Sequence, residues 1–142
     1  MANSLFSQAR EGFAVGEVNW STGVIKVALV RGYTFDDTDK FVSDVTGGGG
    51  TLHATSAALG SKTATNGVLD AADVTFTTPA ADANDHSILI FQSSAVGGGA
   101  DVAATAQRVI AWIDTATGLP IRPNGANITI SWDDGANRIL KI

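Results

Sequence analysis

Apolar and polar residues alternate along much of this chain with the two-residue period of a β-strand. The pattern is clearest in the last 35 residues, which read RVIAWIDTATGLPIRPNGANITISWDDGANRILKI from Arg108 to Ile142. Turn-forming residues separate three apolar runs there, at Gly118-Leu119-Pro120, Pro123-Asn124-Gly125 and Asp133-Asp134-Gly135. Alternating runs bounded by Gly, Pro, Asn and Asp are typical of hairpin-connected strands. The pattern therefore predicts an antiparallel meander over residues 108–142.

Two other apolar runs predict buried strands, VIKVALV over residues 24–30 and HSILIFQ over residues 86–92. Shorter strands are expected over 51–65 and 74–78, and Asn66-Gly67 is a typical hairpin turn. The total of about seven or eight strands predicts an all-β fold, an antiparallel sandwich or barrel. We expect a single β domain over 1–142, in which 1–20 form an arm or short helix and 21–142 form the sandwich or barrel.

Helical spacing occurs near the N-terminus, where Leu5, Phe6 and Phe13 fall near one face of a short helix over residues 4–13. A second helical turn is expected over residues 38–45. The N-terminal face has two interpretations, packing on its own sheet or docking on a neighbouring subunit. Trp20 is flanked by Asn19 and Ser21, so it is the tryptophan expected to be exposed or at an interface. The predicted interface residues are thus Leu5, Phe6, Phe13 and Trp20.

Composition narrows the expected partners. The net charge of −5 and the dispersed Lys and Arg residues disfavour nucleic acid and anionic membranes. No apolar run approaches the roughly 18–20 residues of a membrane helix, and the N-terminus does not follow the pattern of a signal peptide. Only 16% of residues are charged and the mean hydropathy is +0.15, which favours a chain that buries surface against protein partners.

Candidate chemistry is sparse. His53 and His86 are the two histidines, there is no cysteine, and Asp85 and His86 are strand neighbours that point to opposite faces. The glycine runs 47–50 and 97–99 are expected to be mobile loops, since no G-K-[ST] follows them. The acidic cluster 36–39 lacks the EF-hand pattern. We therefore predict no catalytic, cofactor-binding or metal-binding residue and no enzymatic activity.

Three segments carry a resemblance to a known family, namely SLFSQAREGFAVGEVNWSTGVIKVALV, KTATNGVLDAADVTF and IDTATGLPIRPNGANITISWDDGANRILKI. They resemble a family of small virion proteins encoded in the structural gene clusters of tailed bacteriophages. The resemblance implies a head decoration (cement) or tail-associated protein, and it supplies no site motif. The glycine runs 47–50 and 97–99 depart from the family's pattern.

We expect a capsid decoration protein that stabilises the head lattice as a homotrimer, without cofactors and without nucleic-acid or membrane partners. The expected partners are the major capsid protein or other virion proteins. The expected location is the virion, assembled in the cytoplasm of a bacterial host. A tail- or fibre-associated structural protein is one alternative. A carbohydrate- or receptor-binding β-sandwich that uses Trp20 is another.

Overall fold

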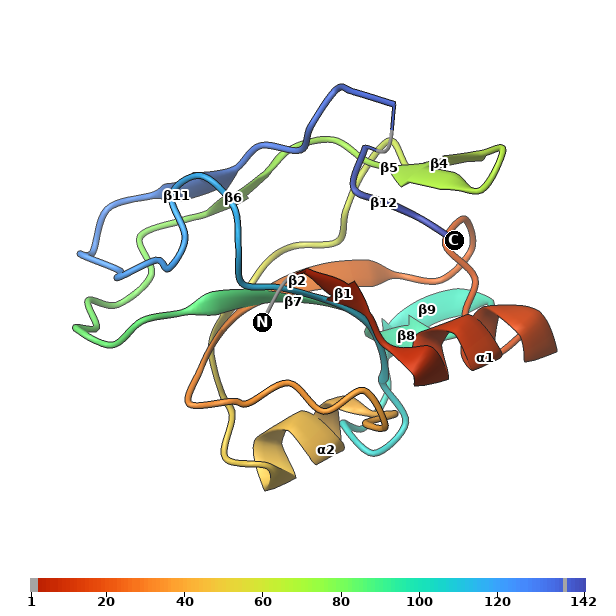
Figure 1. The fold of residues 1–142 in the computed structure, drawn as a ribbon, viewed down its shortest axis with the longest axis horizontal. Helices are drawn as coiled ribbons and strands as arrows, with labels where there is room; N and C mark the ends of the chain where they lie inside the picture. Colours follow the sequence, from red (N-terminus) through yellow and green to blue (C-terminus); the bar gives the residue numbers. More distant parts are fainter. Residues whose placement is uncertain (1–2, 137) are drawn as a thin grey trace.

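A five-stranded antiparallel sheet lies at the centre of the computed structural model, which describes residues 3–136 and 138–142 (Figure 1). Its strand order is β1-β10-β7-β2-β3. The strands are β1 (Ser4–Leu5), β10 (Arg108–Ile113), β7 (Ser87–Gln92), β2 (Ile25–Arg31) and β3 (Thr51–Thr55). Strands β2, β7 and β10 are the inner strands, and they are also the longest apolar runs of the sequence.

Both faces of this sheet are covered, which explains the nearly continuous apolar sequence of its inner strands. In β2, Val27 and Leu29 join the core on one face, whereas Ala28 and Val30 join the core on the other. Successive side chains of a strand point to opposite faces, so a strand covered on both sides needs apolar residues throughout. The predictions of buried strands over residues 24–30 and 86–92 are confirmed.

Two small sheets form a second layer over one face of the central sheet (Figure 1). One pairs β6 (Val74–Phe76) with β11 (Ile128–Ile130), and the other joins β12 (Leu140–Lys141), β5 (Val68–Asp70) and β4 (Thr63–Thr65). The predicted Asn66-Gly67 turn connects β4 to β5, with φ values of 54° and 76°. Residues with positive φ at both central positions are what a type I′ hairpin requires.

Two helices complete the fold. Helix α1 (Ser7–Val15) packs beside β10 and ends at Gly16, whose φ of 78° is the left-handed conformation that glycine adopts most readily. Helix α2 (Val42–Gly47) lies beneath the central sheet in Figure 1 and buries Val42 and Val45. The predicted helical turn over residues 38–45 is therefore confirmed only from Val42 onward, because Phe41 is extended and forms a β-bridge with Arg108. Within the described residues, no helix is long and apolar enough to cross a membrane.

The all-β fold is confirmed, with the layers forming an open arrangement of sheets instead of one closed barrel. The described residues contain twelve strands, several of only two or three residues. Short strands of this kind are hard to detect because alternation needs about four residues to show a period.

The predicted C-terminal meander is wrong. Its three strands belong to three different sheets, since β10 pairs with β7 and β1, β11 pairs with β6, and β12 pairs with β5. The alternation predicts that each run is a strand, but it does not determine which other strand the run pairs with. Residues 114–127 carry the chain from the central sheet to the second layer instead of forming a tight turn.

The glycine runs are also more regular than predicted. Residues 97–99 belong to a hairpin between β8 (Ser94–Ala95) and β9 (Gly98–Asp101). In the other run, Gly47 is the last residue of α2 and Gly50 is buried, with its N–H donating to Val45 O at 3.0 Å. Composition alone predicts a mobile loop over residues 47–50, but hydrogen bonds to the last turn of α2 hold its backbone.

Candidate functional site

The side chains of the predicted interface residues lie in or against the core of their own chain. Trp20 is 2% exposed, and its indole N–H donates to Asp70 O at 3.1 Å, so the prediction of an exposed Trp20 is wrong. Its polar neighbour Asn19 serves the turn, because Asn19 Oδ1 accepts from the N–H groups of Ser21 and Thr22 at 2.9 and 3.1 Å. The polar residues that suggested exposure therefore shape the backbone while Trp20 points inward.

Phe6 is 0% exposed and belongs to the same hydrophobic core as Val42 and Val45 of α2. Leu5 and Phe13 are half-buried and pack against the edges of the cores. In this conformation Phe6 and Trp20 offer no surface to a partner, whereas Leu5 and Phe13 keep some. Whether these residues contact a neighbouring subunit stays a prediction.

A polar network beside α1 joins the N-terminal segment of the resemblance to the central sheet. A Cβ added to Gly12 would lie 2.6 Å from Val18 Cγ2 and 2.7 Å from Arg108 Nη2, so only glycine fits at this point. The Arg108 guanidinium is buried and donates to the Glu17 carboxylate. Gln92 Nε2 donates to Glu17 O at 3.1 Å. Each of these contacts holds α1 and the following turn on the central sheet.

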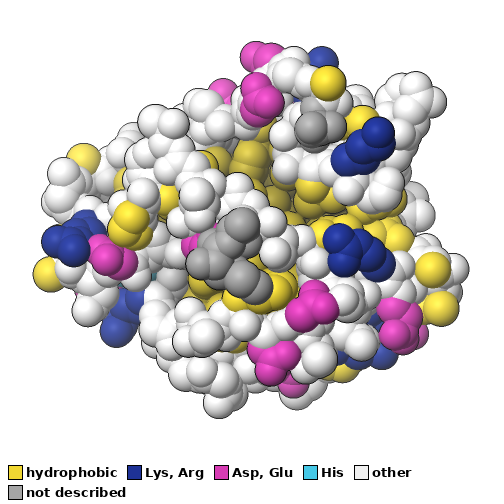
Figure 2. Space-filling view, viewed as in Figure 1, with side chains coloured by type: hydrophobic (Ala, Val, Ile, Leu, Met, Phe, Trp, Pro, Cys, Tyr) yellow, Lys and Arg dark blue, Asp and Glu magenta, His cyan; other side chains and the backbone are white. Residues whose placement is uncertain are grey.

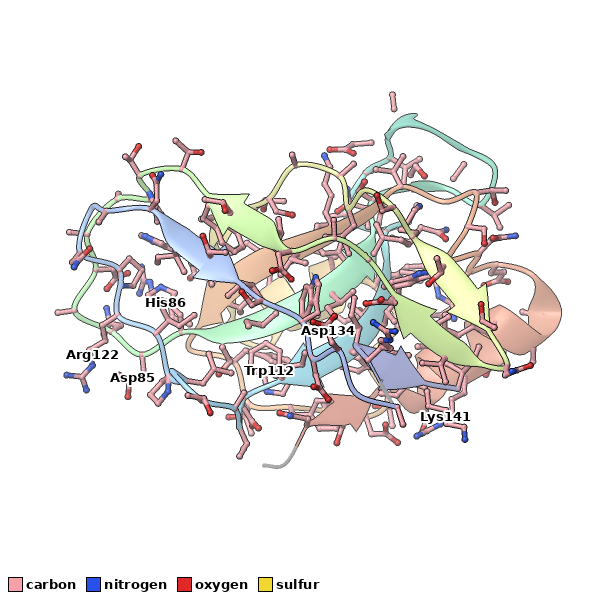
Figure 3. The ribbon with its side chains drawn as sticks, turned by 90° about the horizontal axis from the view of Figure 1, so that it is seen from above. Asp85, His86, Trp112, Arg122, Asp134 and Lys141 are labelled. Carbon is pink, nitrogen blue, oxygen red and sulfur yellow. The ribbon has the colours of Figure 1, made fainter. Side chains whose placement is uncertain are left out.

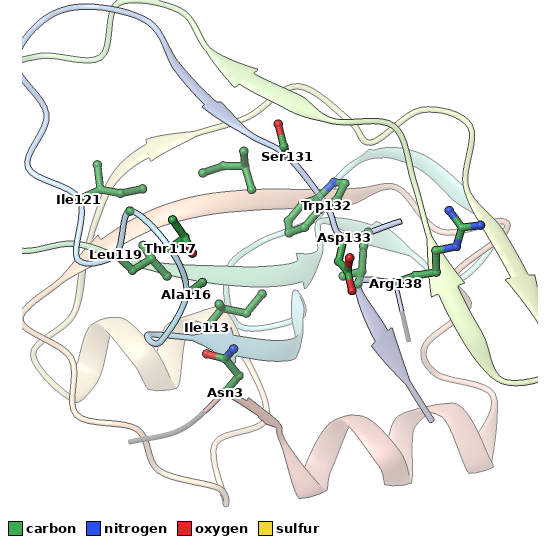
Figure 4. A pocket seen from close by; sticks show the side chains of 13 residues that line it. Asn3, Ile113, Ala116, Thr117, Leu119, Ile121, Ser131, Trp132, Asp133 and Arg138 are labelled. Atoms are coloured by element: carbon green, nitrogen blue, oxygen red, sulfur yellow. The ribbon is translucent and has the colours of Figure 1, made fainter. Parts of the chain in front are cut away.

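An apolar groove opens between the central sheet and the second layer, with a volume of about 300 Å³ (Figure 4). Figure 2 shows hydrophobic side chains in the hollow between the two layers. The apolar lining is half-buried and comes from both layers, namely Ile113, Leu119, Ile121, Ile130, Trp132 and Ile139. Since the second layer consists of short strands, it does not fully cover the face beneath it.

A second feature lies at another place in the fold, where His53, Asp82 and His86 converge. Each residue offers one atom that could bind a metal, and these three atoms all lie within 4.8 Å of one another. Asp82 Oδ2 is 3.6 Å from His53 Nδ1 and 3.6 Å from His86 Nε2. The two imidazole rings have centroids 4.8 Å apart. No other group of three or more His, Asp or Glu side chains comes together in this way among the residues described.

The sheet explains how residues so far apart in sequence meet. Strands β3 and β7 flank β2, and both Leu52 and Ser87 lie opposite Val30. His86 immediately precedes Ser87. The β2–β3 register passes from Leu29↔Ala54 to Val30↔Leu52, so His53 is the extra residue of a β-bulge. Bulges re-aim the side chain of the extra residue.

Asp82 comes from the loop between β6 and β7. Its N–H donates to Pro123 O at 2.8 Å, and its Oδ1 accepts from Asn84 N at 2.9 Å and Asn84 Nδ2 at 2.6 Å. The Asn84 backbone N–H is the main cause that holds the pKa of the Asp82 carboxyl below its ordinary value. The group is therefore a carboxylate at neutral pH, with Oδ2 facing the histidines and Arg31 Nε at 3.0 Å.

The sequence did not reveal this cluster because its three residues lie in separate segments of the chain. The local signal at His86 was weak, because its immediate neighbour Asp85 is not part of the cluster. Asp85 instead pairs with Arg122, and Figure 3 shows both projecting outward while His86 lies further in.

The carboxylates of the acidic cluster 36–39 accept hydrogen bonds from groups of their own chain. Asp36 accepts from Thr38, Asp37 accepts from Ser7 at the start of α1, and Asp39 accepts from the Tyr33 hydroxyl at 2.6 Å. The three carboxylates have different partners, and each contact has a folding explanation.

No protein-family model, curated protein or solved structure matches this chain.

Proposed function

We propose that this chain is a structural protein of a tailed-phage virion and acts as a capsid decoration protein. The observation that supports the proposal most directly is the resemblance of three segments to small phage virion proteins. In the fold, the N-terminal segment supplies α1, the following turn and β2, and the C-terminal segment supplies β11, β12 and much of the groove. Residues with these positions build a framework and shape its surface, which is the task of an assembly subunit.

The proposed contact surface is the groove between the two layers. Its six half-buried apolar residues come from both layers. An inserted side chain or loop of the major capsid protein would therefore fill the groove and contact both layers at once. Each Å² of apolar surface removed from water contributes about 25 cal/mol. One such contact is weak, but a lattice repeats it, and linked contacts add through effective concentration. We extend the proposal to a homotrimer, whose formation can be checked by analytical ultracentrifugation.

The carbohydrate-binding alternative depended on an exposed Trp20 as a stacking platform. Because Trp20 is buried with its indole N–H paired, we do not propose that function. The tail- or fibre-associated alternative is separated from decoration by the location of the protein in the particle.

The test is cryo-electron microscopy of virions of the encoding phage, with the expected density on the outer surface of the head. Density on the tail alone would replace decoration by the tail alternative, and no density in the particle would refute both.

A binding assay on heads that lack the protein tests the groove. Ala116 is exposed and lines the groove, so Ala116→Arg should place a charged side chain in its mouth and abolish head binding. Val96 is 40% exposed in the β8–β9 turn, away from the groove lining, so Val96→Arg is the matched control and should bind normally. Equal binding by both variants would remove the groove from the proposal.

A further inference from the structure

We propose that His53, Asp82 and His86 form a binding site for one divalent transition-metal ion of the Zn²⁺ class. The inference goes beyond the proposed virion role and does not depend on it. It starts from the hydrogen bonds that fix the protonation of each imidazole.

The partner carbonyls determine which ring nitrogens carry the protons. His53 Nε2 is 2.7 Å from Ala80 O, and a carbonyl only accepts, so Nε2 carries the proton in the neutral ring. His86 Nδ1 is 2.9 Å from Asn84 O and 3.2 Å from Ile121 O, so its proton lies on Nδ1. The nitrogens left with free lone pairs are His53 Nδ1 and His86 Nε2, the two atoms that face Asp82.

A histidine that binds a metal usually donates its other ring N–H to a carbonyl or carboxylate, which fixes the ring and makes the ligand nitrogen more basic. Both histidines already donate one ring N–H to a backbone carbonyl and leave the other ring nitrogen unprotonated.

The three facing atoms have no hydrogen bond between them. At 3.6 Å the Asp82 Oδ2 contacts to both imidazoles are too long for hydrogen bonds, and two neutral lone pairs and a carboxylate oxygen have no proton to share. His86 is 0% exposed and its Nε2 has no hydrogen-bond partner. A buried ring nitrogen without a partner is costly, so the arrangement favours a ligand that accepts its lone pair.

The spacing suits a small divalent cation. A tetrahedral centre with bonds of about 2.0 Å places its ligand atoms about 3.3 Å apart, so the two 3.6 Å separations need to contract by only a few tenths of an ångström. The third pair lies within 4.8 Å and closes with a modest movement of His53, which sits in the bulge of an edge strand. Two imidazoles and one carboxylate suit Zn²⁺, Co²⁺ or Ni²⁺ better than the oxygen-seeking Mg²⁺ and Ca²⁺.

Arg31 is the competitor for this site. Its Nε is 3.0 Å from the same Asp82 Oδ2, and its side chain is 40% exposed, so it can swing into solvent when a metal binds. Removing its charge should strengthen metal binding, because a neighbouring cation raises the electrostatic cost of adding another. If the cluster were only an ion-pair network around Arg31, the same change would create no metal affinity at all.

The test uses the full chain without a histidine tag, stripped with EDTA and titrated with ZnCl₂ at pH 7.5. Isothermal titration calorimetry and elemental analysis after dialysis should give one ion per chain. At a hundredfold excess over Kd the melting temperature should rise by about 8 °C. Binding should weaken with acidification, because metal binding requires deprotonated ligand atoms and protons compete for them. The absorption spectrum with Co²⁺ should show bands of a tetrahedral or five-coordinate centre.

Three variants connect the binding to these residues. Asp82→Asn and His53→Gln should weaken Zn²⁺ binding by about a hundredfold or more, and Arg31→Gln should bind more tightly than the parent. Asp85→Asn is the control, because Asp85 is a neighbouring exposed carboxylate that pairs with Arg122 outside the cluster, and it should bind as the parent does. These variants avoid the fully buried His86, so all should fold.

Absence of saturable binding below roughly 1 mM Zn²⁺ in the folded parent would overturn the proposal. Binding that survives in both Asp82→Asn and His53→Gln would do the same. Long-range ¹H–¹⁵N spectra of the imidazoles provide an independent check, with protons expected on Nε2 of His53 and Nδ1 of His86. None of these measurements uses phage particles, so a failure here leaves the virion proposal intact, and the reverse also holds.

Discussion

Replacing Trp20 tests the assignment of this residue to the core of its own chain. Trp20 packs in the core between the central sheet and the second layer, and its indole N–H donates to Asp70 O at the end of β5. Trp20→Ala therefore removes a large buried side chain and leaves a buried carbonyl without its donor. Substitutions of this kind cost about 3–5 kcal/mol of unfolding free energy. A surface tryptophan would cost roughly 0.5 kcal/mol or less.

The assay is equilibrium unfolding in urea, followed by far-ultraviolet circular dichroism and analysed with a common slope for all variants. Trp132→Ala is the matched control. Trp132 makes an equivalent indole hydrogen bond, to Ala72 O at 3.1 Å, but it lies half-buried at the groove. Its loss should be smaller, about 1–2 kcal/mol.

A domain of this size has a total stability of about 5–15 kcal/mol, so a marginal parent would not tolerate Trp20→Ala. Trp20→Phe keeps most of the apolar contact and removes the N–H, and it should cost about 1–3 kcal/mol. A loss below about 1 kcal/mol for Trp20→Ala, or a larger loss for Trp132→Ala, would refute the assignment of Trp20 to the core.

Three further predictions use the same unfolding assay. Gly12→Ala should destabilise the protein by about 1–3 kcal/mol, because the new Cβ would overlap two packed side chains. Gly47→Ala in α2 should stabilise it by about 0.5–1 kcal/mol, because the new Cβ would meet no other atom and alanine favours the helix. A change of the same sign in both variants would contradict the packing argument. Gly67→Ala should cost about 1–2 kcal/mol because its φ of 76° is left-handed, and no loss would show that the β4–β5 turn has another geometry. The Asp101 carboxyl has a pKa below its ordinary value mainly because Lys26 donates to it, so Asp101→Asn should cost at most about 1 kcal/mol at pH 7 for this half-exposed pair. Because the folded-state pKa of Asp101 lies below the unfolded value, the ion pair stabilises the protein above the unfolded pKa, and this stabilisation is lost as pH falls through the folded pKa. The stability difference between parent and Asp101→Asn should therefore shrink with acidification, and a difference that does not change with pH would refute the ion-pair explanation.

The sequence alone predicted the central strands well. The runs around Val27, Ile90 and Ile110 are rich in β-branched and aromatic residues, and these three side chains are fully buried. The Asn66-Gly67 turn was equally predictable, because a two-residue hairpin needs residues that tolerate positive φ at both positions. These features depend on neighbours within a few residues, which a local pattern records directly.

The burial of Trp20 could not be predicted in the same way. Its hydrogen-bond acceptor, Asp70 O, lies 50 residues further along the chain, while the polar residues beside it serve the turn. Local polarity therefore indicated exposure where long-range packing produces burial.

The histidine cluster shows the same division more strongly. The sequence placed His53 and His86 near strands but not near each other. Strand order brings β3 and β7 to either side of β2, a bulge re-aims His53, and a separate loop supplies Asp82. The period of a segment determines which residues can be buried, because it depends on backbone geometry within that segment. The pairing of strands depends on contacts between distant segments, so only the tertiary structure decided that the C-terminal runs join three sheets and that two histidines and a carboxylate face one another.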